Sequence, residues 1–130
     1  MLLFAAVLAQ APDAWLGEGL FLEHDLGHHH TPWRAWAAEL WGQGQVPLWC
    51  DSVGCGFPLM ADAQTGVLYP PNIVLGLVLG PWSLVTASLL VHQVWAAAGA
   101  YHLARTLGRT REGAMVAGLA FALGGFFVSH

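Results

Sequence analysis

Charge is what this sequence of 130 residues has least of. Only 9% of its residues are charged, and lysine is absent, whereas water-soluble domains carry about a quarter charged residues. No Asp, Glu, Lys or Arg occurs between Asp62 and Arg105, or from Gly113 to the last residue. Four Arg make no basic patch for a nucleic-acid backbone, which excludes nucleic-acid binding. With 56% hydrophobic residues, the uncharged stretches are expected to lie in lipid.

Cysteine is also scarce, and Cys50 and Cys55 are the only two. A structural zinc site needs four ligands, so two thiols alone are too few. If their loop lies on the oxidising side of a membrane, a disulfide between them is allowed. Two unpaired thiols in a turn fit the sequence equally well, so both alternatives stay open.

Residues 82–104 form the first convincing membrane span, because they are uncharged and have Trp82 and Tyr101 near their ends as interfacial anchors. Residues 113–130 begin a second transmembrane helix, rich in Gly and Ala, which we expect to be truncated. His92 and Gln93 lie in the middle of the first span. We interpret them as hydrogen-bonding groups between helices, with a functional role as the alternative.

The N-terminal apolar run, residues 1–9, is too short to cross ~30 Å of hydrocarbon at 1.5 Å per residue. We therefore expect residues 1–22 to be a partial first transmembrane helix and its outer end. A cleaved signal sequence is the alternative, which the absence of an N-terminal positive charge disfavours.

Three of the four Arg residues fall in the turn 105–112: Arg105, Arg109 and Arg111. By the positive-inside rule this turn is cytoplasmic, which makes residues 23–71 an extracytoplasmic loop. Residues 72–80 are apolar but too short to span, so we expect an interfacial or re-entrant segment. The predicted fold class is an all-α integral membrane protein, an incomplete polytopic helical bundle whose long extracytoplasmic loop contains short interfacial helices.

A short helix is predicted within the loop, from Pro32 to Trp41. Thr31 is its expected N-cap, Pro32 suits the first helical position, and Gly42 and Gly44 end it. Its apolar face consists of Trp33, Trp36, Ala37, Leu40 and Trp41.

The densest polar cluster is the stretch from Glu23 to His30, with sequence EHDLGHHH. In a helix, Asp25 would share a face with His28 and His29, a workable grouping for a divalent metal. Gly27 disfavours a helix there. A solvated His-rich loop without a role is the alternative.

Short motifs follow one another in a fixed order along most of the chain. They are His24-Asp25, Pro32-Trp33-Arg34, Gly44-Gln45-Val46-Pro47-Leu48-Trp49, Gly56-Phe57-Pro58-Leu59, Asp62-Ala63-Gln64, Tyr69-Pro70-Pro71-Asn72, Arg105-Thr106-Leu107-Gly108, Gly113-Ala114 and Gly124-Gly125-Phe126. Their order and spacing resemble the YfhO-like family of bacterial membrane proteins, of which this chain resembles an N-terminal portion.

That family is similar to glycosyltransferase superfamily C, whose polytopic enzymes transfer a sugar from a polyprenyl-phosphate carrier on the outer face of the membrane. The resemblance implies that Asp25, just after the first transmembrane helix, is the general base. Asp62, Arg34 and His28 are weaker candidates for contacts with substrate or phosphate. The resemblance also implies the bacterial inner (plasma) membrane as location. The expected partners are membrane lipid, a lipid-linked sugar, and the remaining helices of a longer chain or a partner subunit.

Two features depart from the family pattern. Trp49-Cys50-Asp51 stands where the family has Trp-Asn-Pro, and the triple His is not a family feature. His28, His29 and Asp51 are therefore candidate ligands of a divalent metal, the one cofactor that the sequence suggests. The alternative functions are a non-catalytic membrane protein fragment or assembly subunit, and a periplasmic metal-binding module. We expect no enzymatic activity from this chain alone.

Overall fold

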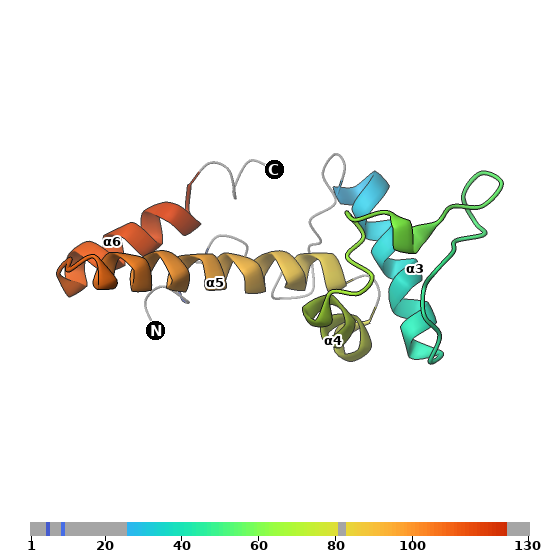
Figure 1. The fold of residues 1–130 in the computed structure, drawn as a ribbon, viewed down its shortest axis with the longest axis horizontal. Helices are drawn as coiled ribbons and strands as arrows, with labels where there is room; N and C mark the ends of the chain where they lie inside the picture. The colour runs from blue at the N-terminus through green and yellow to red at the C-terminus, as the bar shows by residue number, and fades with distance from the viewer. Residues whose placement is uncertain (1–4, 6–8, 10–25, 81–82, 125–130) are drawn as a thin grey trace. The chain divides into compact units, whose positions relative to one another are not determined.

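A computed structural model describes residues 5, 9, 26–80 and 83–124 (Figure 1). Its elements, in chain order, are η1 (Leu26–His30), α3 (Thr31–Gly42), η2 (Leu59–Ala61), α4 (Pro70–Leu79), α5 (Leu84–Thr106) and α6 (Arg111–Ala122). These residues form helices and turns, with one isolated β-bridge between Cys50 and Phe57 and no strand. The all-α prediction is thus confirmed for the part of the chain that is described.

The chain divides into two compact units, which are treated separately below. The first, Gly19–Ser88, is called the loop unit and contains η1, α3, η2, α4 and the start of α5. The second, called the hairpin unit, consists of Met1–Glu18 and Leu89–His130 and contains the rest of α5 with α6. The predicted partial first helix, residues 1–22, lies outside the described residues except for Ala5 and Ala9.

In the loop unit, α3 forms where the spacing of its Trp and Ala residues predicts a helix. Its start differs from the prediction. Thr31 is the first helical residue and is buried, while His30 occupies the N-cap position with helical backbone angles and makes no side-chain capping bond. The cause is η1, a π-helical turn that runs directly into α3, so the chain is already helical before Thr31.

Helix α4 packs against α3 at a point of close approach (Figure 1). Pro70 and Pro71 occupy its first turn, where their missing N–H groups cost nothing. Gly76 is buried, and a Cβ atom placed on it would lie 3.1 Å from Cζ3 of Trp41 and 3.2 Å from Cβ of Ala38. The bare backbone of Gly76 therefore sets how closely the two helices approach.

The core of the loop unit is a small apolar cluster of Ala37, Cys50, Leu59 and Val67. Four aromatic side chains pack around it: Trp33, Trp36, Trp41 and Phe57. The cluster joins α3 to η2 and to the two chain segments that flank η2. The irregular segment 43–69 is thus held against α3 by apolar contacts as well as by hydrogen bonds.

In the hairpin unit, α5 and α6 are joined by a tight turn. Gly108 adopts φ +76°, and its N–H donates to the carbonyl of Arg105 at 3.1 Å. The N–H of Gly113 donates to Oγ1 of Thr110 at 3.1 Å, which makes Thr110 the N-cap of α6. The pKa of the Glu112 carboxyl is lowered by a bond from its own backbone N–H and by the Thr110 hydroxyl.

Helices α5 and α6 also meet further along their lengths. Val94 and Ala97 pack with Ala122, and Nε2 of the buried Gln93 donates to the carbonyl of Ala122 at 2.7 Å. The predicted interhelical hydrogen bond is therefore confirmed for Gln93. Because Ala122 is the last residue of α6, this bond satisfies a carbonyl that the helix itself leaves open.

Among the described residues, α5 is the one helix long and apolar enough to cross a membrane, by length and composition. It covers 84–106, close to the span expected at 82–104; residues 81–82 and 125–130 are not described. Helix α4 is apolar but has only 10 residues, and α6 has 12. The second predicted span, residues 113–130, therefore stays a prediction.

Replacement of Gly76 by Leu is expected to lower the stability of the loop unit by about 1–3 kcal/mol, because the new side chain has no room between α3 and α4. The matched control is Gly99→Leu in α5, where no atom of the described residues lies within 4 Å of a Cβ atom. Both changes raise helix propensity equally. Thermal melts followed by circular dichroism in lipid nanodiscs measure the difference, and equal melting temperatures would contradict this packing.

Candidate functional site

The predicted site residues of the loop unit do not all fall in the described part. Asp25, the expected general base, lies outside it. His28 is exposed, and the ring of His29 lies 5.0 Å from that of Trp33, which in turn meets Phe57 edge to face at 3.7 Å. His29 thus belongs to an aromatic row at the start of α3.

No group of three His, Cys, Asp or Glu side chains suited to a metal ion occurs among the residues that the structure describes. Asp51 is exposed in the loop that the Cys50–Phe57 bridge closes, and it forms no metal-binding group with His28 and His29. Moreover, Leu26–His30 is a π-helical turn, whose repeat is longer than that of the α-helix assumed for the i+3 and i+4 spacing. The metal site stays a prediction.

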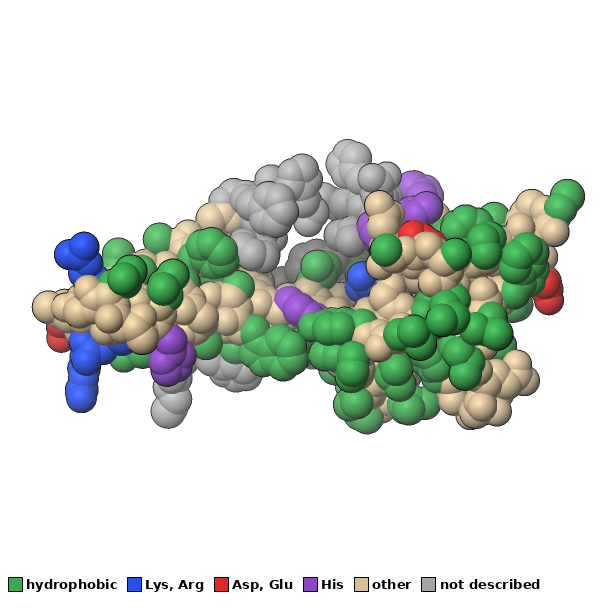
Figure 2. Space-filling view, in the orientation of Figure 1, with side chains coloured by type: hydrophobic (Ala, Val, Ile, Leu, Met, Phe, Trp, Pro, Cys, Tyr) green, Lys and Arg blue, Asp and Glu red, His purple; other side chains and the backbone are tan. Residues whose placement is uncertain are grey.

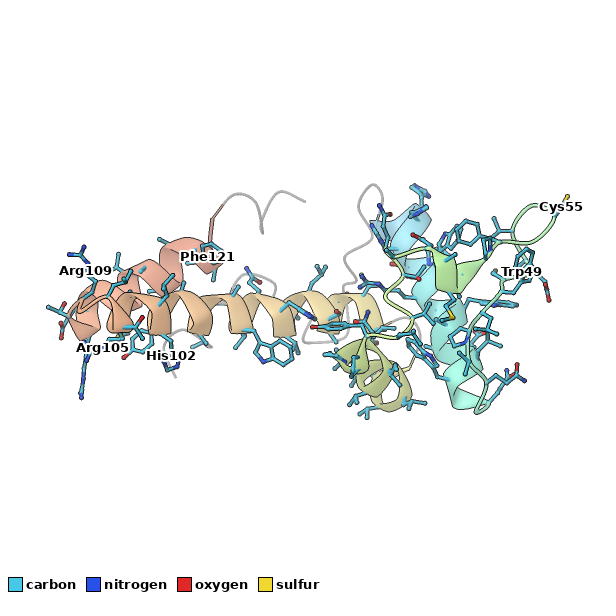
Figure 3. The ribbon with its side chains drawn as sticks, in the orientation of Figure 1. Trp49, Cys55, His102, Arg105, Arg109 and Phe121 are labelled. Atoms are coloured by element: carbon cyan, nitrogen blue, oxygen red, sulfur yellow. The ribbon has the colours of Figure 1, made fainter. Side chains whose placement is uncertain are left out.

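The two cysteines have different environments, and both are free thiols. Cys50 is buried in the core of the loop unit, whereas Cys55 is exposed. Figure 3 shows the Cys55 sulfur pointing outward from the tip of the loop. The sequence leaves open either a disulfide or two unpaired thiols, and the structure has the unpaired thiols.

Arg34 and Asp62 meet on the backbone of Gln64. Nη2 of Arg34 donates to the Gln64 carbonyl at 3.4 Å, and Oδ1 of Asp62 accepts from the Gln64 N–H at 3.0 Å. Thr65 fixes the same turn, since its hydroxyl donates to the carbonyls of Asp62 at 2.8 Å and Leu59 at 3.0 Å. Two of the three predicted substrate contacts are therefore brought to one segment, residues 62–65.

The guanidinium of Arg34 is partly desolvated, and this affects its pKa. Burial lowers the pKa of its guanidinium, through desolvation. Its Nε atom is buried, and no acceptor in the described part of the chain reaches it. A desolvated cation is costly unless an anion or a strong acceptor meets it. Arg34 thus keeps one buried N–H donor without an acceptor among the described residues, next to the Nη2 group that bonds Gln64.

Asn72 ties three segments of the loop unit together. Its side chain is 2% exposed. Its Oδ1 accepts a hydrogen bond from the Ser88 hydroxyl at 3.0 Å, and its Nδ2 lies 3.5 Å from the carbonyl of Gly66. Gly66, at φ +61°, leaves room for this amide, because a Cβ there would lie 2.7 Å from Nδ2. The turn at 66, α4 and the start of α5 therefore share one buried amide.

Trp49 is held against Gly56 across the Cys50–Phe57 bridge. The two bridge residues exchange backbone hydrogen bonds of 2.8 Å in each direction. A Cβ on Gly56, at φ +108°, would lie only 2.4 Å from Cζ2 of Trp49. Trp49, labelled in Figure 3, nevertheless remains 49% exposed as a whole residue.

The surface of the loop unit is largely apolar. Figure 2 shows hydrophobic side chains covering most of the visible face around α4. On α4 the exposed ones are Val74, Leu77, Val78 and Leu79; along the irregular segment they are Val46, Leu48, Trp49, Val53, Met60, Leu68 and Tyr69. Contiguous apolar surface of this kind marks contact with lipid, a ligand or a partner.

Two contacts in this site were not predicted from the sequence. The first is the Asn72–Ser88 bond, although a lone Asn at the start of an apolar run is itself a signal that its amide is satisfied by a specific partner. The second is the Trp49–Gly56 contact, which no local pattern announces because it crosses the bridge.

Replacement of Asn72 by Ala is expected to destabilise the loop unit by about 1–3 kcal/mol, because the buried Ser88 hydroxyl loses this acceptor. A double-mutant cycle with Ser88→Ala checks the pairing, with the exposed Ser83→Ala as the control. Chemical denaturation in lipid nanodiscs provides the free energies of unfolding. Additive effects of the Asn72 and Ser88 changes would show that the bond does not contribute.

Comparison with protein-family models, curated proteins and solved structures finds no match to this chain.

Proposed function

We propose that this chain is the N-terminal part of a polytopic membrane glycosyltransferase that uses a polyprenyl-phosphate-linked sugar and acts on cell-envelope acceptors. The single observation that favours this function is Arg34, a desolvated guanidinium whose buried Nε has no acceptor among the described residues. Such a group suits the phosphate that leaves in the transfer. The ordered motifs that resemble the YfhO-like family support the same proposal.

The motifs of this resemblance are also neighbours in the folded loop unit. Trp33 meets Phe57 edge to face, Trp49 contacts Gly56, and Leu59 lies in the core with which Trp33 and Phe57 pack. Motifs that are separated in the sequence therefore build one substructure. This supports a common role for them in shaping a single site.

The proposed chemistry assigns one task to each charged group. The acceptor oxygen attacks the anomeric carbon while Asp25 takes the proton of the acceptor hydroxyl. The bond from the anomeric carbon to the phosphate oxygen breaks, and its electron pair leaves with the phosphate. Arg34 stabilises the negative charge that grows there. Asp62 positions the turn at 62–65 against which the Arg34 side chain lies.

The proposed membrane arrangement places α5 across the bilayer of the bacterial inner membrane, with the turn of Arg105, Arg109 and Arg111 in the cytoplasm. Figure 3 labels two of these, Arg105 and Arg109, at the end of the α5–α6 hairpin. The loop unit is then extracytoplasmic, on the side where a flipped lipid carrier presents its sugar. The apolar exposed face of α4 suits contact with the outer lipid interface.

The alternative function, a non-catalytic fragment or assembly subunit, is favoured by the surface of the hairpin unit. Its exposed large apolar side chains are Leu89, Trp95, Leu103, Leu107, Val116, Phe121 and Leu123. Such a surface needs lipid or further helices to cover it. The two functions differ in the role of Asp25, so they are separated by an activity measurement.

Cys55 provides a direct test of the proposed orientation. A membrane-impermeant maleimide added to intact spheroplasts is expected to label Cys55 in a Cys50→Ser variant, because Cys55 is exposed in the loop. A Cys55→Ser variant is the control, since the remaining Cys50 is buried and should react slowly. Labelling of Cys55 that requires permeabilised cells would place the loop in the cytoplasm and end the transferase proposal.

Asp25→Asn in the complete longer protein is expected to lower the transfer rate by about 10²–10⁴-fold, the usual contribution of a general base. Arg34→Gln is expected to lower it by about 10²-fold, and Arg34→Lys by less, because Lys keeps the charge. Arg109→Gln, in the exposed turn of the hairpin, is the matched control. Transfer of radiolabelled sugar is the measurement. Full transfer by the Asp25 variant would remove it from the mechanism.

A further inference from the structure

Trp49 is an exposed aromatic side chain in a fixed position. The three atoms of its ring nearest to a Cβ on Gly56 are Cζ2 at 2.4 Å, and Cε2 and Nε1 at 2.6 Å each. These atoms are consecutive along one edge of the indole, so Gly56 lies at that edge of the ring. Trp49 as a whole residue is 49% exposed, so about half of its surface stays accessible beside this contact.

The backbone around Trp49 restricts the ring further. Cys50 and Phe57 are joined by two 2.8 Å hydrogen bonds, and the N–H of Met60 donates to the carbonyl of Leu48 at 3.2 Å. Cys50 and Leu59 are buried in the core, which anchors both sides of the bridge. A preorganised aromatic ring loses little conformational entropy when a ligand covers it. Trp49 thus has the properties of a binding platform.

The chemistry beside the ring favours a sugar as the ligand. The face of an aromatic ring is the negative end of its quadrupole. The C–H groups on one face of a pyranose ring are made positive by the neighbouring oxygens, so they are attracted to such a face. Asp51, two residues along, is exposed, and a carboxylate is a strong acceptor for sugar hydroxyl groups.

A lipid surface is the competing occupant, because Leu48 and Val53 are also exposed. Asp51 opposes it, since a carboxylate is costly to bring into a bilayer and anionic headgroups repel it. Between residues 35 and 104 the chain has no Lys or Arg to compensate. The observations around Trp49 therefore favour a neutral polyhydroxylated ring over a phospholipid.

We propose that the indole of Trp49 is a stacking platform for a hexose ring, with the Asp51 carboxylate accepting hydrogen bonds from its hydroxyl groups. The choice of a sugar rests on the proposed function, in which one of the two substrates presents such a ring. Gly56 is a positioning residue, because any larger residue would displace the indole. The platform acts in binding and takes no part in the transfer of protons or electrons.

Saturation-transfer NMR on the whole chain in phosphatidylcholine nanodiscs tests the proposal, with methyl β-D-glucopyranoside and methyl α-D-mannopyranoside as probes. No glycoside detergent is used. Glycerol, which has hydroxyl groups and no ring, is the negative probe. Trp49→Ala is expected to weaken binding of at least one glycoside about three- to tenfold. Trp49→Phe, which keeps a ring, is expected to weaken it less.

The matched control is Trp95→Ala, since Trp95 is 54% exposed on α5 and lies in the other unit. Binding that is unchanged in Trp49→Ala, equally reduced in Trp95→Ala, or absent in the unmodified chain overturns the proposal. Circular dichroism checks that each variant is folded. Quenching by brominated phosphatidylcholine of the fluorescence that Trp49→Phe removes would place the ring in lipid and also overturn it.

The two proposals can fail separately. If the complete protein binds glycosides through Trp49 but transfers no sugar, the binding platform is supported and the transferase function is contradicted. If the Trp49→Ala variant transfers sugar with an unchanged KM, the transferase function is supported and the binding platform is contradicted.

Discussion

The buried amide of Asn72 is the interaction on which the loop unit depends. It accepts from Ser88 on α5 and reaches Gly66 in the preceding turn, so it joins two helices and an irregular segment at one point. A buried amide is stable only with its partners in place, which makes the arrangement specific. Among the described residues, the central apolar cluster of the loop unit is small, with four buried members. Hydrogen bonds such as this one therefore contribute much of the specificity of the loop unit's fold.

From this fixed point the two candidate sites follow. The turn at 62–65 lies between η2 and Gly66; it begins at Asp62, whose Oδ1 accepts from the Gln64 N–H, and its Gln64 carbonyl accepts from Arg34. The Cys50–Phe57 bridge precedes η2 and presents Trp49. One site offers a desolvated cation, and the other offers an aromatic surface beside a carboxylate. These are the groups that recognise, respectively, an anion and a neutral polyhydroxylated ring.

Local features of the fold were predictable, and long-range ones were not. Pro32 and the spaced Trp residues predict α3 because they act within one helix. The N-cap prediction at Thr31 is wrong because the π-helical turn before it leaves no bare helix end. Gln93 was predictable, since an amide inside an apolar helix requires a partner. The hydrogen bond from Arg34 to Gln64 joins residues 30 positions apart, which no local pattern encodes. Asp25 lies outside the described residues, and its role stays a prediction.

The hydrogen bond from Gln93 to the carbonyl of Ala122 at the end of α6 bears on how α5 and α6 are aligned along their axes. A side-chain amide matches one carbonyl only, and a slip of α6 by a single residue shifts that carbonyl by about 1.5 Å along the axis. The bond therefore favours one register between the two helices, whose apolar contact nearby is made by Val94, Ala97 and Ala122. A change of register between the two helices would cost this buried hydrogen bond, about 0.5–1.5 kcal/mol net.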